Sequence, residues 1–137
     1  MGSRVHRAPV LALIALVAAL AVAGCGSSDK PEYCSKTDDL KGAVDDLKGD
    51  VTSANLGDVQ SGLASVESDA KEVVSAAKQD FPAQTTALEA SVTSLSTQIQ
   101  DLPDSPSPQE LLQLAPFVGS AAAAVQAFAN DTQSECD

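Results

Sequence analysis

Apolar residues recur at alternating steps of three and four along most of the chain beyond residue 34. This spacing places side chains on one face of an α-helix. It predicts helices over about residues 35–53, 58–80, 83–101 and 108–132. Strand-type alternation of convincing length is missing from the sequence, so we expect an all-α fold.

Each predicted helix has its own apolar face. The first contains a duplicated heptad, DDLKGAV at 38–44 and DDLKGDV at 45–51, and Ser35 or Thr37 is its expected N-cap. The four faces comprise Leu40, Val44, Leu47 and Val51; Leu56, Val59, Leu63, Val66, Ala70, Val73 and Ala77; Leu88, Val92, Leu95, Ile99 and Leu102; and Leu111, Leu114 or Ala115, Val118, Ala122, Val125 and Ala129.

Prolines and small polar residues separate these segments. Residues 53–58 (SANLGD) predict a turn, and 103–108 (PDSPSP) predict a break. Phe81-Pro82 favours a helix end, because the residue before proline avoids the helical region. Pro116 should kink the last helix or split off a short first piece. One alternative stays open, in which the chain remains helical through Pro82 as one long central helix with two helices folded back on it.

The first 24 residues have the pattern of a secretory leader. Arg4 and Arg7 precede an uninterrupted apolar run at residues 10–23, and small residues follow it. A positive start, an apolar run of this length and a small-residue end are typical of a signal peptide. The run is short for a membrane-spanning helix, which needs about 20 residues.

Val22-Ala23-Gly24-Cys25 resembles the lipobox of bacterial lipoproteins. The resemblance covers the first 25 residues, and Val22 stands where leucine is commoner. It implies cleavage between Gly24 and Cys25, attachment of diacylglycerol to the Cys25 sulfur, and acylation of the new N-terminus. Two chains give stable attachment to a bilayer. The expected organisation is a signal peptide over 1–24, a lipidated tether over 25–33 and a helical domain over 34–137, held on the outer face of the cell membrane.

Two cysteines remain, Cys34 and Cys136, and an even pair in an oxidising compartment predicts a disulfide. Short loops make successive helices antiparallel, so the start of the first and the end of the fourth lie at the same end of an up-down-up-down bundle. The disulfide therefore favours an antiparallel four-helix bundle over an odd number of similar helices. Tyr33 either caps this end of the bundle or is exposed.

Charge excludes several kinds of partner. Removal of residues 1–24 leaves six lysines, all 19 acidic residues, no arginine and no histidine, a formal charge of −13. Nucleic acid is not an expected partner, because it requires clustered Lys or Arg. Without arginine there is no bidentate recognition of anions, and without histidine general acid–base work falls to carboxylates or lysine.

No motif in the chain predicts catalysis, a metal site or a cofactor. The aspartate pairs 38/39 and 45/46 lack the alternating ligands and final glutamate of a calcium loop, so they are interpreted as a solvated helix face. Ser75-Ala-Ala-Lys78 matches the SxxK pattern of penicillin-binding proteins, but the companion elements are missing or out of order and the domain is too small.

The chain is also similar, over residues 34–137, to small Ala/Ser-rich secreted lipoproteins of high-GC Gram-positive bacteria. The residues that carry this resemblance are Cys34-Ser-Lys and Ser134-Glu-Cys136-Asp. It implies a location and a fold but no mechanism. We expect a non-catalytic envelope lipoprotein that acts as a helical interaction or structural module, with an envelope protein as partner. The alternative is a carrier of a small apolar ligand or peptide in a cavity between helices.

Overall fold

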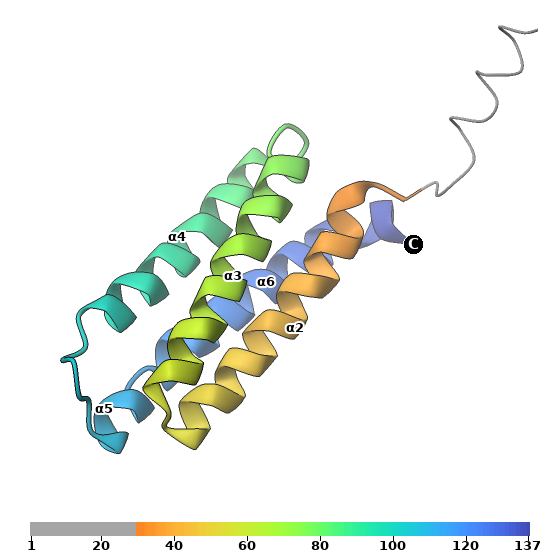
Figure 1. Ribbon diagram of the computed structural model, residues 1–137. Helices are drawn as coiled ribbons and strands as arrows, with labels where there is room; N and C mark the ends of the chain where they lie inside the picture. The colour runs from red at the N-terminus through yellow and green to blue at the C-terminus, as the bar shows by residue number, and fades with distance from the viewer. Residues whose placement is uncertain (1–29) are drawn as a thin grey trace, which may run out of the picture.

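A computed structural model describes residues 30–137 and shows an antiparallel bundle of four long helices (Figure 1). The expectations for residues 1–24, including cleavage after Gly24, and for lipidation of Cys25 fall outside the described residues. Four helices of about 20 residues form the bundle, and a fifth of one turn lies at its far end. Their bounds are α2 Glu32–Ser53, α3 Leu56–Ala77, α4 Pro82–Gln100, α5 Pro108–Leu112 and α6 Ala115–Cys136.

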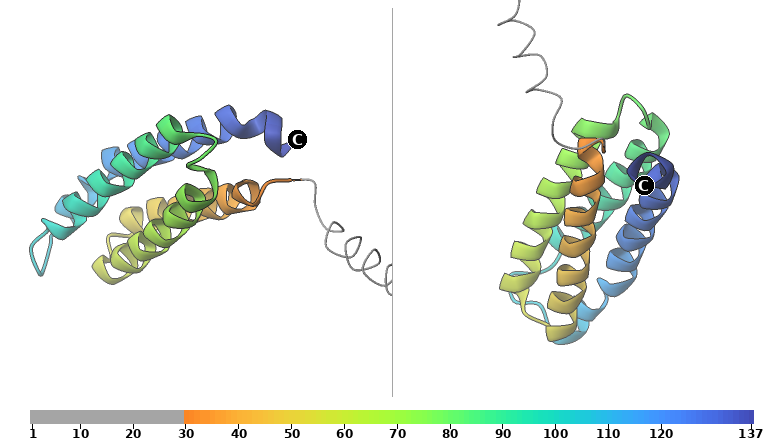
Figure 2. Two further views of the ribbon diagram at one scale, coloured as in Figure 1. Left: turned by 90° about the horizontal axis from the view of Figure 1, so that it is seen from above. Right: turned by 90° about the vertical axis from the view of Figure 1, so that its right-hand side faces the viewer.

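The long helices pack as two layers, α2 with α3 and α4 with α6 (Figure 2). Each helix also contacts one helix of the other layer, α2 against α6 and α3 against α4. The expected apolar faces turn inward to one core. Its fully buried large side chains, each less than 2% exposed, are Phe128, Leu40, Leu47, Leu88, Leu95, Leu111, Val44, Val59, Val66, Val73, Val118 and Val125. On α6, however, the buried positions are Ala121 and Phe128 rather than the predicted Ala122 and Ala129, which are only partly buried.

Proline positions explain why the helices break where they do. Pro82 occupies the first turn of α4, where its missing N–H leaves no helical hydrogen bond unmade. Phe81 before it has non-helical backbone angles, so the long central helix is excluded and α3 and α4 are separate. Pro116 lies in the first turn of α6, and a short piece, α5, is split off ahead of it as the sequence predicted.

The helix ends differ from the predicted ones in several places. The first helix begins at Glu32 with Pro31 as N-cap, so the predicted caps Ser35 and Thr37 are wrong. Both hydroxyls lie inside the helix and donate to backbone oxygens one turn earlier. Residues 32 and 33, expected in the tether, therefore belong to the bundle. Asn55 caps α3 at Leu56, two residues before the predicted start, and α6 continues to Cys136 rather than ending near 132.

The α5–α6 segment, Pro108–Cys136, is long and apolar enough to cross a membrane by length and composition alone. In the bundle it packs against α2 and α4, and buried Leu95 and Phe128 belong to the same core cluster. The core helix of a bundle meets the same criterion. One such helix is therefore weak evidence of a membrane span.

Candidate functional site

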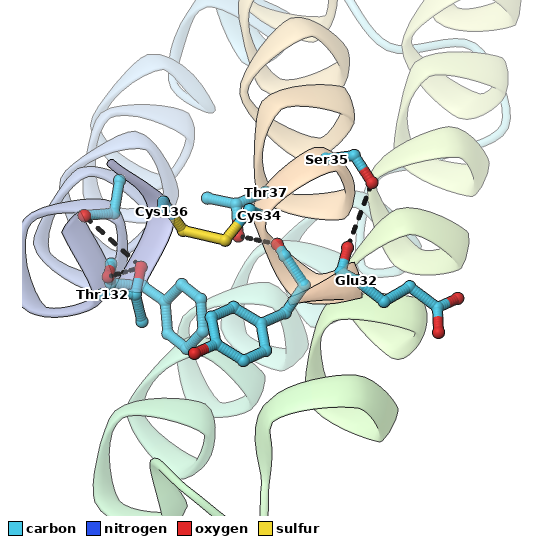
Figure 3. The surroundings of a disulfide bond; sticks show 9 residues. Glu32, Cys34, Ser35, Thr37, Thr132 and Cys136 are labelled. Atoms are coloured by element: carbon cyan, nitrogen blue, oxygen red, sulfur yellow. Dashed lines mark hydrogen bonds between the residues drawn. A yellow bond between two sulfur atoms is a disulfide. The ribbon is translucent and has the colours of Figure 1, made fainter. Parts of the chain in front are cut away.

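The disulfide end of the bundle brings together the two cysteines that the sequence paired. Cys34 and Cys136 are bonded, with 5.6 Å between their Cα atoms and a sequence separation of 102. The bond joins the first turn of α2 to the last turn of α6 (Figure 3). The disulfide prediction and the topology derived from it are confirmed.

An aromatic cluster lies beside the disulfide and holds three elements together. Tyr33 of α2, Phe81 of the α3–α4 turn and Phe128 of α6 meet edge to face, with ring centroids 5.6–6.5 Å apart. Tyr33 is 4% exposed, so of the two expectations for it the capping role is correct. Burial raises the pKa of its phenol, and Glu135 and Asp80 raise it further.

Buried threonines complete this end without leaving polar atoms unpaired. The Thr37 hydroxyl donates to the Tyr33 carbonyl oxygen at 2.6 Å, and the Thr132 hydroxyl donates to the Phe128 carbonyl oxygen at 2.9 Å. Such bonds to the preceding turn allow a hydroxyl to be buried in a helix. An open groove of about 780 Å³ lies between α2 and α6, and both threonines and both cysteines are among its lining residues.

A second feature is an acidic groove on the opposite side of α2, between α2 and α3. Its volume is about 870 Å³, and glycine, alanine and serine residues line it between the carboxylates. The two predicted aspartate pairs lie along it and are exposed, as expected of a solvated helix face. Sequence spacing gave no signal for the two aspartates that α3 adds. In all, seven aspartates line the groove: Asp38, Asp39, Asp45, Asp46, Asp50, Asp58 and Asp69.

Electrostatics within this acidic groove are repulsive. Burial raises the pKa of Asp69, and the negative charges of Asp39 and Glu72 raise it further. Near one end, Lys36 of α2 forms an ion pair with Glu72 of α3 at 2.9 Å. The hydrogen bond to Glu72 raises the pKa of Lys36. An exposed pair of this kind contributes little to stability.

The structure does not gather the remaining motif residues into a site. Ser75 and Lys78 of the SxxK match are both exposed at the end of α3. Within residues 30–137, no group of three or more His, Cys, Asp or Glu side chains is arranged to hold a metal ion. A third groove, of about 460 Å³, lies between α3 and α4 and includes Ala70, Val74 and Val92 in its lining.

Comparison of the chain with protein-family models, with curated protein sequences and with solved structures finds no match in any of the three.

Proposed function

We propose that the protein is a membrane-anchored, non-catalytic envelope lipoprotein whose bundle presents a rigid anionic surface to another envelope protein. The observation that supports this most is the position of the chain ends. The residues that follow the expected tether and the C-terminal residues lie together at the disulfide end. α2 has 22 residues, so at a rise of 1.5 Å per residue the helices extend about 33 Å from that end.

The charge of the side faces then favours a particular kind of partner. The acidic groove carries seven aspartates, and no lysine is among its lining residues. Aligned carboxylates of one sign attract a partner that exposes Lys or Arg, and they act on the rate of encounter more than on affinity. The disulfide joins α2 to α6, and core packing holds α3 against α2, so this surface needs little ordering on binding.

Membrane fractionation tests the anchor. Cys25→Ala removes the sulfur to which diacylglycerol would be attached and should move the protein out of the membrane fraction. Cys34→Ser with Cys136→Ser is the matched control, because it removes cysteines without touching the lipobox. Retention of a cleaved Cys25→Ala chain on membranes would contradict lipid anchoring.

Cross-linking in intact cells tests the interaction surface. One variant replaces Asp38, Asp39, Asp45 and Asp46 by asparagine, and a control replaces Glu89, Asp101, Asp104 and Asp131 by their amides. The two have the same change in charge, but only the first alters the acidic groove. We expect the first variant alone to lose the cross-linked partner. Equal retention in both would count against this surface.

The α3–α4 groove supports the carrier as a second proposal. Its volume of about 460 Å³ suits a small ligand, and Val74 and Val92 supply apolar contacts. Titration with a fluorescent fatty acid should then show saturable binding, and Val74→Trp, which fills the groove, should remove it. Absence of saturable binding to the wild-type protein would eliminate this second function.

A further inference from the structure

The two cysteine residues of the disulfide differ in their exposure to solvent. Cys34 is 9% exposed, whereas Cys136 is half-buried, and both contribute to the groove between α2 and α6. That groove is open and large enough to admit a small thiol. Thiol–disulfide exchange depends on which sulfur an attacking thiolate can reach. Access therefore favours Cys136 as the sulfur attacked.

The two sulfurs also belong to helix ends of opposite polarity. Cys34 is the third residue of α2. No side chain caps that N-terminus, and the Cys34 N–H donates to the Pro31 carbonyl oxygen at 3.1 Å. Cys136 is the last residue of α6, which has no basic residue in its last turn. A helix N-terminus stabilises a thiolate, and a C-terminus disfavours one.

Neighbouring charges add to the same difference. Glu135 and Asp137 flank Cys136 directly in the sequence. On the α2 side, Lys30, Glu32, Asp38 and Lys41 line the groove with both signs of charge, and Asp80 of the α3–α4 turn acts on the nearby Tyr33. Burial by itself disfavours a thiolate at Cys34, but the N–H groups of the first turn oppose that penalty.

We propose that the Cys34–Cys136 disulfide is a directional site for thiol exchange, in which an incoming thiolate bonds to Cys136 and expels Cys34. In the first step the S–S bond breaks, a bond forms between the incoming sulfur and the Cys136 Sγ, and the electron pair leaves on the Cys34 Sγ. With a dithiol, its second thiolate then attacks the mixed disulfide and expels Cys136. Two electrons pass from the dithiol to the protein, and the cysteine thiolates take up protons from water.

Glutathione is the probe for the first step. The full chain carrying Cys25→Ser, purified in detergent, is exposed briefly to glutathione, quenched with acid and alkylated. Cleavage after Lys36 and Lys78 separates the two cysteines for mass spectrometry. We expect glutathione on Cys136 and the alkyl group on Cys34, in excess over the reverse by about threefold or more. A leaving thiol of lower pKa departs faster in exchange.

Two variants separate local electrostatics from simple exposure. Glu135→Gln removes a carboxylate beside Cys136 and should reduce the excess, whereas Asp131→Asn, one turn earlier on the exposed side of α6, should leave it unchanged. In the reduced protein, alkylation of Cys34 should reach half-maximal rate at a lower pH than alkylation of Cys136. Equal distribution of glutathione between the two cysteines, glutathione predominantly on Cys34, or coincident pH profiles would each overturn the proposal.

Discussion

Ala54 is the residue at which local conformation and residue type disagree. It ends α2 in the left-handed region with φ 55°, and it has the only positive φ of a non-glycine residue between 30 and 137. An L side chain there clashes with its own backbone, whereas glycine does not. Ala54→Gly should therefore raise the free energy of unfolding, by up to about 1 kcal/mol.

Urea denaturation measures this effect, and a second alanine provides the control. Ala90 lies within α4 and is exposed. Ala90→Gly should lower stability by about 1 kcal/mol, because glycine is unfavourable in a helix interior. Loss of stability in both variants would show that Ala54 is not held in the left-handed region in solution.

Asp69 gives the residue-scale prediction for pH. Its pKa in the folded protein is raised above the unfolded value, so the folded state binds the proton more tightly than the unfolded state. The ionised carboxyl therefore destabilises the fold at neutral pH. Asp69→Asn should stabilise the protein at pH 7 by about 0.2–0.5 kcal/mol, the size of a like-charge repulsion on a helix.

The stability gain of Asp69→Asn should disappear as the pH falls below the ordinary carboxyl range, about pH 4, where the wild-type side chain is also neutral. Thermal unfolding of the two proteins across this pH range measures it. Asp104→Asn, in the exposed α4–α5 loop, is the control and should show no such pH dependence. A constant difference between Asp69→Asn and wild type at every pH would contradict the origin in ionisation.

At the scale of elements, three glycines within helices divide into two kinds. A Cβ added at Gly42 or Gly49 of α2 would meet nothing within 4 Å, whereas one at Gly62 of α3 would lie 2.6 Å from an Asp50 carboxylate oxygen and 3.1 Å from Leu47 Cδ1. Gly42 and Gly49 therefore have no packing role inside the bundle. Gly62 permits α3 to approach α2 closely.

Alanine substitution should separate these two kinds of glycine. Gly42→Ala and Gly49→Ala should each stabilise the protein by about 0.5–1 kcal/mol, because alanine loses less backbone freedom on folding. Gly62→Ala should lose most or all of that gain, since Asp50 and Leu47 must shift. Equal gains at all three positions, measured by chemical denaturation, would show that α2 and α3 are not in close contact at Gly62.

The helices themselves were predictable because burial of one helix face requires apolar residues at steps of three and four, and the sequence shows that spacing. Leu40, Val44, Leu47 and Val51 were assigned to one face, and all four are buried. Helix ends were less predictable. Capping depends on backbone angles as well as on the side chain. Asn55 has the angles of a cap and accepts from the Asp58 N–H, whereas Ser35 and Thr37 have side chains suited to a cap but lie inside α2.

The candidate sites required the arrangement of the whole chain. The cysteine pair followed from counting, but the aromatic cluster depends on Tyr33, Phe81 and Phe128, which are separated by 48 and 47 residues and meet only through topology. The acidic groove likewise needs Asp58 and Asp69 of α3 beside the pairs on α2. Periodicity reveals which residues of one helix are buried, but not which exposed faces become neighbours.

For the whole molecule, the disulfide closes nearly the entire domain, because its cysteines have a sequence separation of 102. Cross-linking a loop of that length lowers the entropy of the unfolded chain and stabilises the fold by about 4–5 kcal/mol in the chain-entropy model. Small domains are stable by only about 5–15 kcal/mol, so the bond supplies a large share. Cys34→Ser with Cys136→Ser should lower the urea midpoint markedly while helicity at 25 °C persists.

Phe128→Ala in the oxidised protein separates the role of the disulfide from that of the aromatic cluster beside it. Phe128 is 2% exposed, and its truncation should cost about 3–5 kcal/mol through lost burial and a cavity. Because Phe128 lies in the aromatic cluster beside the disulfide, the two losses should not simply add, and the triple variant measures the coupling between them. An unchanged midpoint in the cysteine variant, with the wild-type bond verified by mass spectrometry, would show that packing alone closes this end of the bundle.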